Sequence, residues 1–181
     1  SSTGLIRPDQ PDHKQRPFRS TNVAMAELDI GIDDPSSPDV IELLDSHLAF
    51  AQKWSSPEDV NVLDPARLSS DTISFFSARM CGRLLAVAAL RTLNAMHAEI
   101  KTMHTAEEAR GQGVGNALLK HMVTAARGRG YARVSLETGQ GEAFAPARLL
   151  YCRSGFEICP PFGDYGISAD SVCMTLNLSS P

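Results

Sequence analysis

The segment from Ala98 to Arg127 constrains the fold of this chain most, because it changes from strand-like to helix-like patterning across a glycine-rich turn. Its first part, residues 98–105, contains alternating and β-branched side chains and predicts a strand. Its last part predicts an amphipathic helix, because apolar or small residues recur three and four positions apart: Gly115, Leu118, Leu119, Met122, Val123 and Ala126.

The turn between these two elements predicts an anion-binding site. Gly111, Gly113 and Gly115 let the backbone bend sharply and approach a ligand closely. The start of a helix presents unpaired N–H groups and a partial positive charge, and both favour phosphate. Arg110 adds a fixed cation beside the turn.

Two common phosphate-binding loops do not fit this turn. The GxxxxGK[ST] loop requires Lys and Ser or Thr, and neither follows Gly115 in the required register. The GxGxxG loop, begun at Gly111, requires glycine where Asn116 stands. A glycine-rich helix start with no ligand is the structural alternative.

The spacing Arg110-x-x-Gly113-x-Gly115 resembles the Q/R-x-x-G-x-G/A pyrophosphate loop of the GNAT N-acetyltransferases. A second segment, ARLLYCRSGF at residues 147–156, is similar to the A-x-x-L-Y-x-x-x-G-F signature of the same family. The two motifs occur in the family's order, with a predicted strand between them. One departure is Phe144, which stands where family members often carry an asparagine that contacts the pantetheine.

The remaining elements follow the order expected from this resemblance. Two strand patterns separated only by Cys81-Gly82 predict a hairpin, and a strand, helix and strand then predict a parallel crossover. The resemblance implies an α/β GNAT fold whose mixed, mostly antiparallel sheet has about six to seven strands, splayed at the cofactor site and flanked by helices. The predicted elements outside the central segment are strands at 27–32, 72–80, 83–91, 131–137, 156–159 and 171–178, and helices at 40–51, 65–70 and 143–154.

Length and charge limit the classes of protein that this chain can represent. The 181 residues fit one domain, and we expect residues 25–181 to form it, with residues 1–24 as an N-terminal arm or an added tail. A formal charge of -4 argues against a nucleic-acid surface, and no apolar run is long enough to span a membrane. We therefore expect a cytoplasmic protein, and a homodimer is one way to hold the arm in place.

The four cysteines do not indicate a metal site. Cys81, Cys152, Cys159 and Cys173 form no CxxC pair and no Cys/His cluster with zinc-like spacing. Cys152 adjoins Tyr151, but one step along a helix turns the side chain by about 100°. We expect neither a metal ion nor a covalent enzyme intermediate.

The resemblance implies acetyl-CoA as the co-substrate and assigns residues to it. The turn would hold the pyrophosphate, the strand before it would hold the pantetheine through its backbone, and the second motif would lie along the cofactor. The residues assigned in this way are Met103, Thr105, Arg110, Gly111, Gln112, Gly113, Val114, Gly115, Asn116, Ala147 and Tyr151.

Acetyl transfer to an amine requires a group that removes a proton from the amine and a group that protonates the departing thiolate. Tyr151 stands at the position of the family's tyrosine, which implies the role of acid. Glu99 is the candidate base and His104 the alternative, since its ordinary pKa suits neutral pH. Alternation places Glu99, Lys101 and Met103 on one face of the strand unless a bulge near Met103 changes the register.

The acceptor is expected to be an amine of a small molecule or a peptide. The acidic charge of the chain favours a cationic amine, and Glu99, Asp164 and Tyr165 are the residues expected to contact it. Two alternatives stay open: a protein-lysine acetyltransferase, and a non-catalytic module that binds acyl-CoA.

Overall fold

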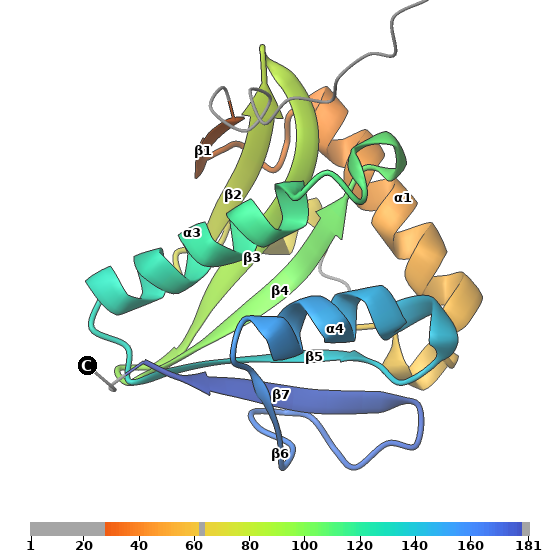
Figure 1. Ribbon diagram of the computed structural model, residues 1–181, viewed down its shortest axis with the longest axis vertical. Helices are drawn as coiled ribbons and strands as arrows, with labels where there is room; N and C mark the ends of the chain where they lie inside the picture. Colours follow the sequence, from red (N-terminus) through yellow and green to blue (C-terminus); the bar gives the residue numbers. More distant parts are fainter. Residues whose placement is uncertain (1–27, 62–63, 179–181) are drawn as a thin grey trace, which may run out of the picture.

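The computed structural model describes residues 28–61 and 64–178, and Figure 1 shows a central sheet with helices packed around it. The expected arm at residues 1–24 and the start of the expected domain at residue 25 lie outside the described residues. The sheet has seven strands in the order β1-β2-β3-β4-β5-β7-β6, and only β4 and β5 pair in parallel. The predicted mixed, mostly antiparallel sheet is confirmed.

The strands and helices have the following bounds. The strands are β1 (Leu28–Ile32), β2 (Ile73–Met80), β3 (Arg83–Asn94), β4 (His97–Thr105), β5 (Arg133–Gly139), β6 (Glu157–Cys159) and β7 (Ser171–Asn177). The helices are α1 (Pro38–Trp54), α2 (Pro65–Leu68), α3 (Val114–Gly128) and α4 (Ala145–Arg153), with short 3-10 turns η2 (Pro57–Asp59), η3 (Glu107–Ala109) and η4 (Glu142–Phe144).

Strand β3 is the centre of the core. Seven consecutive residues, from Leu84 to Leu90, are buried, so both faces of the strand are covered even though successive side chains point to opposite faces. Helix α3 contacts β3 across its apolar stripe, and α1 also packs on β3 and β4. The hairpin that joins β2 to β3 turns at Cys81 and Gly82, whose φ angles of 50° and 80° give the tight turn that the sequence predicts.

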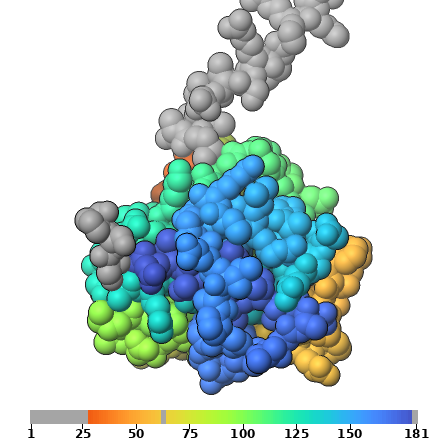
Figure 2. All heavy atoms as spheres, turned by 60° about the horizontal axis from the view of Figure 1, so that its bottom comes forward, coloured from red at the N-terminus to blue at the C-terminus, as the bar shows by residue number. Residues whose placement is uncertain are grey.

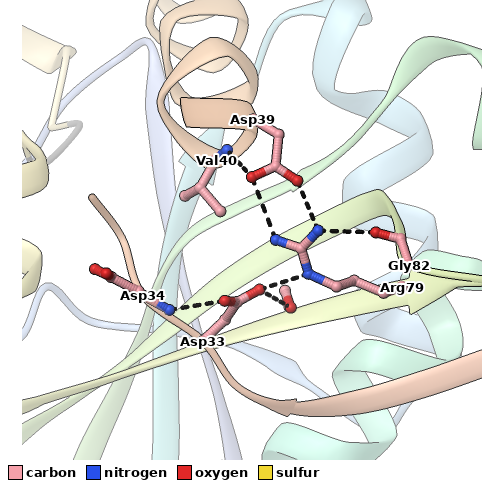
Figure 3. Close-up of polar contacts among 7 residues, drawn as sticks. Asp33, Asp34, Asp39, Val40, Arg79 and Gly82 are labelled. Carbon is pink, nitrogen blue, oxygen red and sulfur yellow. Dashed lines mark hydrogen bonds and ion pairs between the residues drawn. The ribbon is translucent and has the colours of Figure 1, made fainter. Parts of the chain in front are cut away.

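An ion-pair cluster fastens the start of α1 to the sheet (Figure 3). Arg79 of β2 donates from Nε to Asp33 at 2.8 Å and from Nη1 to Asp39, in the first turn of α1, at 2.6 Å. Burial raises the pKa of Asp33, but hydrogen bonds from Ser77 and Arg79 outweigh it and hold the pKa below its usual value. One guanidinium therefore connects β2, the β1–α1 turn and α1.

Strands β4 and β5 separate after a short paired stretch, and Figure 1 shows them diverging. His97 to Glu99 pair with Arg133 to Ser135, and no later residue of β4 pairs with β5 in the described structure. The remainder of β5 pairs only with β7 on its other side. The rest of β4 therefore has one edge whose backbone groups are not used by the sheet.

A bulge in β4 changes which side chains share a face. Thr102 has a φ of +55°, and the pairing of β3 with β4 shifts register between Val87 and Ala89. Lys101 then contacts Tyr165 of the β6–β7 connection, whereas the Met103 methyl group points toward Gly115 of α3. The expectation from strict alternation that Lys101 and Met103 share a face is wrong, for the reason that the bulge adds one residue.

Candidate active site in the gap between β4 and β5

A cavity of about 560 Å³ occupies the gap between the two diverging strands. Residues of β4, β5, α1, α3, η4 and α4 line it, so every element that the sequence motifs predict contributes to one space. All the residues that the resemblance assigns to acetyl-CoA line this cavity except Gln112, whose side chain instead donates to the carbonyl of Glu108 at 2.6 Å.

The start of α3 forms the cationic end of the cavity. Gly111 and Gly113 have φ angles of +72° and +84°, which favour glycine and which turn the chain into the helix. The first N–H groups of a helix have no partner within it, so they are available to an anion. Arg110 and Arg153 line the cavity here, and Arg110 Nε donates to the carbonyl of Thr105 at 3.2 Å.

The middle of the cavity offers unused hydrogen-bonding groups. The edge of β4 that faces β5 has no strand partner after Glu99. The hydroxyl of Thr102 is buried, and within the described residues it has no hydrogen-bond partner. A buried polar group without a partner costs about 1–3 kcal/mol, so its position in the cavity wall favours a polar ligand. These groups fit an extended, amide-containing chain such as pantetheine.

Tyr151 lies on α4 and lines the same cavity. Its ring packs 5.9 Å from that of Phe156, which fixes its orientation from below the helix. Burial, with the nearby charge of Glu137, raises the pKa of Tyr151 to about 12. The phenol therefore keeps its proton at neutral pH, as a group that donates to a thiolate requires.

His47 and His104 meet on the α1 side of the cavity. Their Nδ1 atoms are 3.2 Å apart, so one imidazole donates and the other accepts. Burial lowers the pKa of His47 to about 3 and that of His104 to about 4, with the charge of Arg110 a further cause at His104. Both rings are neutral at pH 7, and a neutral imidazole can accept a proton.

Glu99 does not line this cavity, although the sequence favours it as the base. Its side chain is 1% exposed, and Oε1 accepts a hydrogen bond from the Tyr165 hydroxyl at 2.5 Å. Lys101 Nζ donates to the same hydroxyl at 2.6 Å. Burial and the charge of Glu99 raise the pKa of Tyr165. Glu99 is therefore linked to the cavity through Tyr165 and Lys101, which both line it.

Three further titratable side chains in the wall have no acid–base role assigned from the sequence. Glu137 is half-buried, and burial raises its pKa. A hydrogen bond from Ser171 opposes this effect but does not outweigh it. Arg153 and Lys101 line the cavity from α4 and β4. The sequence signal that could have pointed to these residues is their spacing of two or of three to four positions from motif residues. Such spacing is too common to distinguish site residues from others.

Phe144 replaces the family asparagine and packs as a hydrophobic wall. Its ring lies 5.3 Å from that of Phe50, which brings η4 and α1 together across the cavity. Cys152, by contrast, is exposed and does not line the cavity. Among residues 28–61 and 64–178, no three potential ligands are grouped as a metal ion requires, and no helix has the length and apolar character of a membrane span.

The fold and this site are those of an acetyltransferase. Residues 40–156 match the model of the acetyltransferase (GNAT) family. The chain is 40% identical over 151 residues to the uncharacterized N-acetyltransferase YsnE of Bacillus subtilis (strain 168), a match that covers 83% of this chain and 100% of that protein. The chain therefore belongs to the GNAT family of N-acetyltransferases, whose members use acyl-CoA and act on amines.

Solved structures agree on the fold. A putative acyl-CoA N-acyltransferase from Klebsiella pneumoniae superposes with a TM-score of 0.70 and 25% identity, over 84% of this chain and 99% of that one. A GNAT acetyltransferase from Elizabethkingia anophelis, solved with acetyl-CoA bound, superposes with a TM-score of 0.62 and 21% identity, over 84% and 99% of the two chains.

Proposed function

We propose that this enzyme transfers the acetyl group of acetyl-CoA directly to the amine of a small molecule. One observation carries the proposal: a single cavity joins an anion-binding helix start, an unused strand edge and the hydroxyl of Tyr151. Acetyl-CoA, when bound, supplies an acetyl group that its thioester makes reactive toward an amine.

The residues that would hold acetyl-CoA follow from the chemistry of the cavity wall. The N–H groups at the start of α3 with Arg110 and Arg153 suit the pyrophosphate, which is anionic. The free edge of β4 and the Thr102 hydroxyl suit the amides of pantetheine. Ala147 is small and lets that chain pass beneath α4.

Tyr151 donates the proton that the departing thiolate needs. The amine proton goes either to His104 or to Glu99. His104 is the direct acceptor, because its ring lines the cavity, although burial lowers its pKa to about 4 and so makes it a weaker base than an ordinary imidazole. Glu99 is the indirect acceptor: the Tyr165 oxygen takes the amine proton while the Tyr165 hydroxyl proton passes to Glu99 along their hydrogen bond, in which the two oxygen atoms are 2.5 Å apart. In either case the acceptor leaves as a neutral amide.

The substrate side of the cavity favours a small acceptor over a protein. Ser168 of the β6–β7 connection donates to Asp59 of η2 at 2.9 Å, which holds this connection beside the α1–α2 segment. Figure 2 shows the blue C-terminal residues beside the orange residues of the α1 region. Glu137 in the wall attracts a cationic amine, and Tyr165 contacts its remainder. Asp164, which the sequence also favours, does not line this cavity, and its side chain is 98% exposed.

Calorimetric titration of acetyl-CoA and of CoA into the wild type and Asn116→Asp tests the cofactor site. Asn116 lies in the first turn of α3, where a carboxylate stabilises the helix but repels a bound anion. We expect binding at least about tenfold weaker, which is about 1.4 kcal/mol. Thr124→Asp adds the same charge at an exposed position of α3 that does not line the cavity, and should bind nearly as the wild type does. A wild type that binds neither ligand refutes the proposal.

A thiol-release assay with an amine panel then tests the chemistry. Tyr151→Phe should bind acetyl-CoA normally but lower kcat by about 10²–10⁴, the range for losing a general acid. Comparison of His104→Gln with Glu99→Gln identifies the base by which variant loses kcat. Binding without turnover of any amine would favour a non-catalytic module, and turnover of lysine in peptides alone would favour a protein acetyltransferase.

A further inference from the structure

A second cavity, of about 230 Å³, adjoins the candidate active site. Lys101, Tyr165 and Asn61 line both cavities and so form the boundary between them. The rest of the second wall comes from β3, from the α2 segment and from residues 162–165. An acceptor that reaches from the first cavity into the second must pass between these side chains.

Positive charge exceeds negative charge in the second cavity. Arg67, Arg91 and Lys101 line it, opposed by Glu99 and Asp164. Glu99 already lies 3.4 Å from Lys101 Nζ and 3.6 Å from Arg91 Nη1, so two cations face one buried carboxylate. The Asp164 side chain is 98% exposed, and water screens its charge.

The guanidinium groups retain donors for a ligand. Arg91 has five N–H donors, yet its ion pairs with Glu99 and Asp164 are 3.6 and 3.8 Å long. Direct charge-assisted hydrogen bonds are about 2.7–2.9 Å long. Within the described part of the chain, the Arg67 guanidinium makes no hydrogen bond or ion pair, and the residue's hydrogen bonds are made by its backbone groups.

The shape and remaining charge of the cavity select the kind of anion. A guanidinium binds a carboxylate through two parallel N–H bonds, and Leu93, Phe162 and Val60 supply apolar contacts around it. The buried charge of Glu99 disfavours a dianion such as a phosphate monoester. One singly charged, planar group fits best.

We propose that this second cavity, the carboxylate subsite, binds the carboxylate of the acceptor, so that amino acids are preferred over amines that lack an acid group. This inference rests on the proposed acetyl transfer to a small amine. Glu137 in the first cavity attracts the ammonium, and Arg91 with Arg67 binds the carboxylate in the second. The spacing between the two cavities selects the length of the acceptor.

The test compares ω-amino acids of increasing chain length with their primary amides, which keep the amine and remove the negative charge. Acetylation is measured as kcat/KM, and binding of each acceptor to the CoA-bound enzyme is measured by calorimetry. At the best chain length we expect the acid to exceed the amide about tenfold or more, the effect of one charged hydrogen-bonded pair. Arg67→Gln should lower this ratio and leave turnover of the amide nearly unchanged. Arg91→Gln should also lower the ratio, but it removes a cation 3.6 Å from Glu99, so its amide turnover is measured separately.

Arg127→Gln is the matched control, since Arg127 is exposed in the last turn of α3 and lines neither cavity. It should leave the ratio unchanged, and Arg91→Lys should retain part of it. Equal kcat/KM for acids and amides at every length overturns the subsite and leaves the proposed function intact. Selective binding of acids without any acetylation overturns the proposed function and leaves the subsite intact. If the enzyme shows no binding preference for acids and acetylates no acceptor, both the subsite and the proposed function are overturned.

Discussion

Substitution of Gly139 tests the wall that Phe144 forms. A Cβ atom at residue 139 would lie 2.3, 2.5 and 2.7 Å from Cδ2, Cε2 and Cγ of Phe144. Carbon atoms in contact are about 3.5–4.0 Å apart, so the ring must move by more than about 1 Å. Because Cγ is among the three atoms, rotation of the ring about its own axis does not relieve the clash.

We expect Gly139→Ala to destabilise the fold by about 1–3 kcal/mol, the range for overpacking. The φ of Gly139 is not in the left-handed region, so alanine carries no backbone strain there. A loss of about 2 kcal/mol lowers Tm by about 4–8 °C in a domain of this size. The displaced ring also enters the cavity or presses on Phe50, so acceptor KM should rise.

Thermal and urea unfolding of a double-mutant cycle measure this effect. In a Phe144→Ala background the added methyl group meets no ring, so Gly139→Ala should cost at least about 1 kcal/mol less than in the wild type. Gly141→Ala is the matched control, because nothing lies within 4 Å of the added Cβ. It should be neutral or slightly stabilising. Additive costs for Gly139→Ala and Phe144→Ala would refute the steric argument.

Two further predictions concern stability. Arg79→Met should lower the free energy of unfolding in urea by about 2 kcal/mol, because it removes the guanidinium shared by two carboxylates. Arg83→Met is the control and should change little, since its ion pair with Glu108 is exposed. Equal effects of the two substitutions would contradict the anchoring role of Arg79. Burial lowers the pKa of His47 to about 3 and that of His104 to about 4, compared with about 6.5 in the unfolded chain. Between these pKa values the unfolded chain binds more protons than the folded one. The stability of the fold should therefore fall as the pH falls from about 6.5 toward 4. The slope of the unfolding free energy against pH should reach about 1.4 kcal/mol per pH unit for each imidazole. Thermal melts at several pH values measure this slope, and His47→Gln should reduce it. An unchanged slope would show that His47 is not buried in the neutral form.

The local parts of the fold could be predicted because their signals lie within a few residues of one another. The spacing of apolar residues predicts α3, and the Cys81-Gly82 pair predicts the hairpin, since both depend on backbone geometry alone. Element ends were predicted less well: the strand expected at 131–137 is Arg133–Gly139, because its end is fixed by pairing with β7. Pairing partners lie far away in the sequence.

A bulge near Met103 was allowed for by the family resemblance, but its position at Thr102 and the arrangement of the site could not be read from the residues themselves, for the same reason. His47 and His104 are 57 residues apart, and Tyr165 and Glu99 are 66 apart, so their contacts exist only after the sheet forms. A lone histidine in a helical pattern gives no sign of its partner. The sequence singled out Glu99 as the candidate base by its strand alone, and could not assign the hydroxyl that covers it.

The charge of the acceptor shows why local structure must decide a question that net charge cannot. The formal charge of -4 describes the field far from the protein and favours cationic ligands in general. Within the second cavity, however, Arg67, Arg91 and Lys101 outnumber the acidic groups, and the nearest of those, Glu99, is buried against two of them. An acceptor that carries both an ammonium and a carboxylate satisfies the distant field at its amine end and the local field at its acid end. The two observations are therefore compatible in a zwitterion, and in neither a simple amine nor a simple acid.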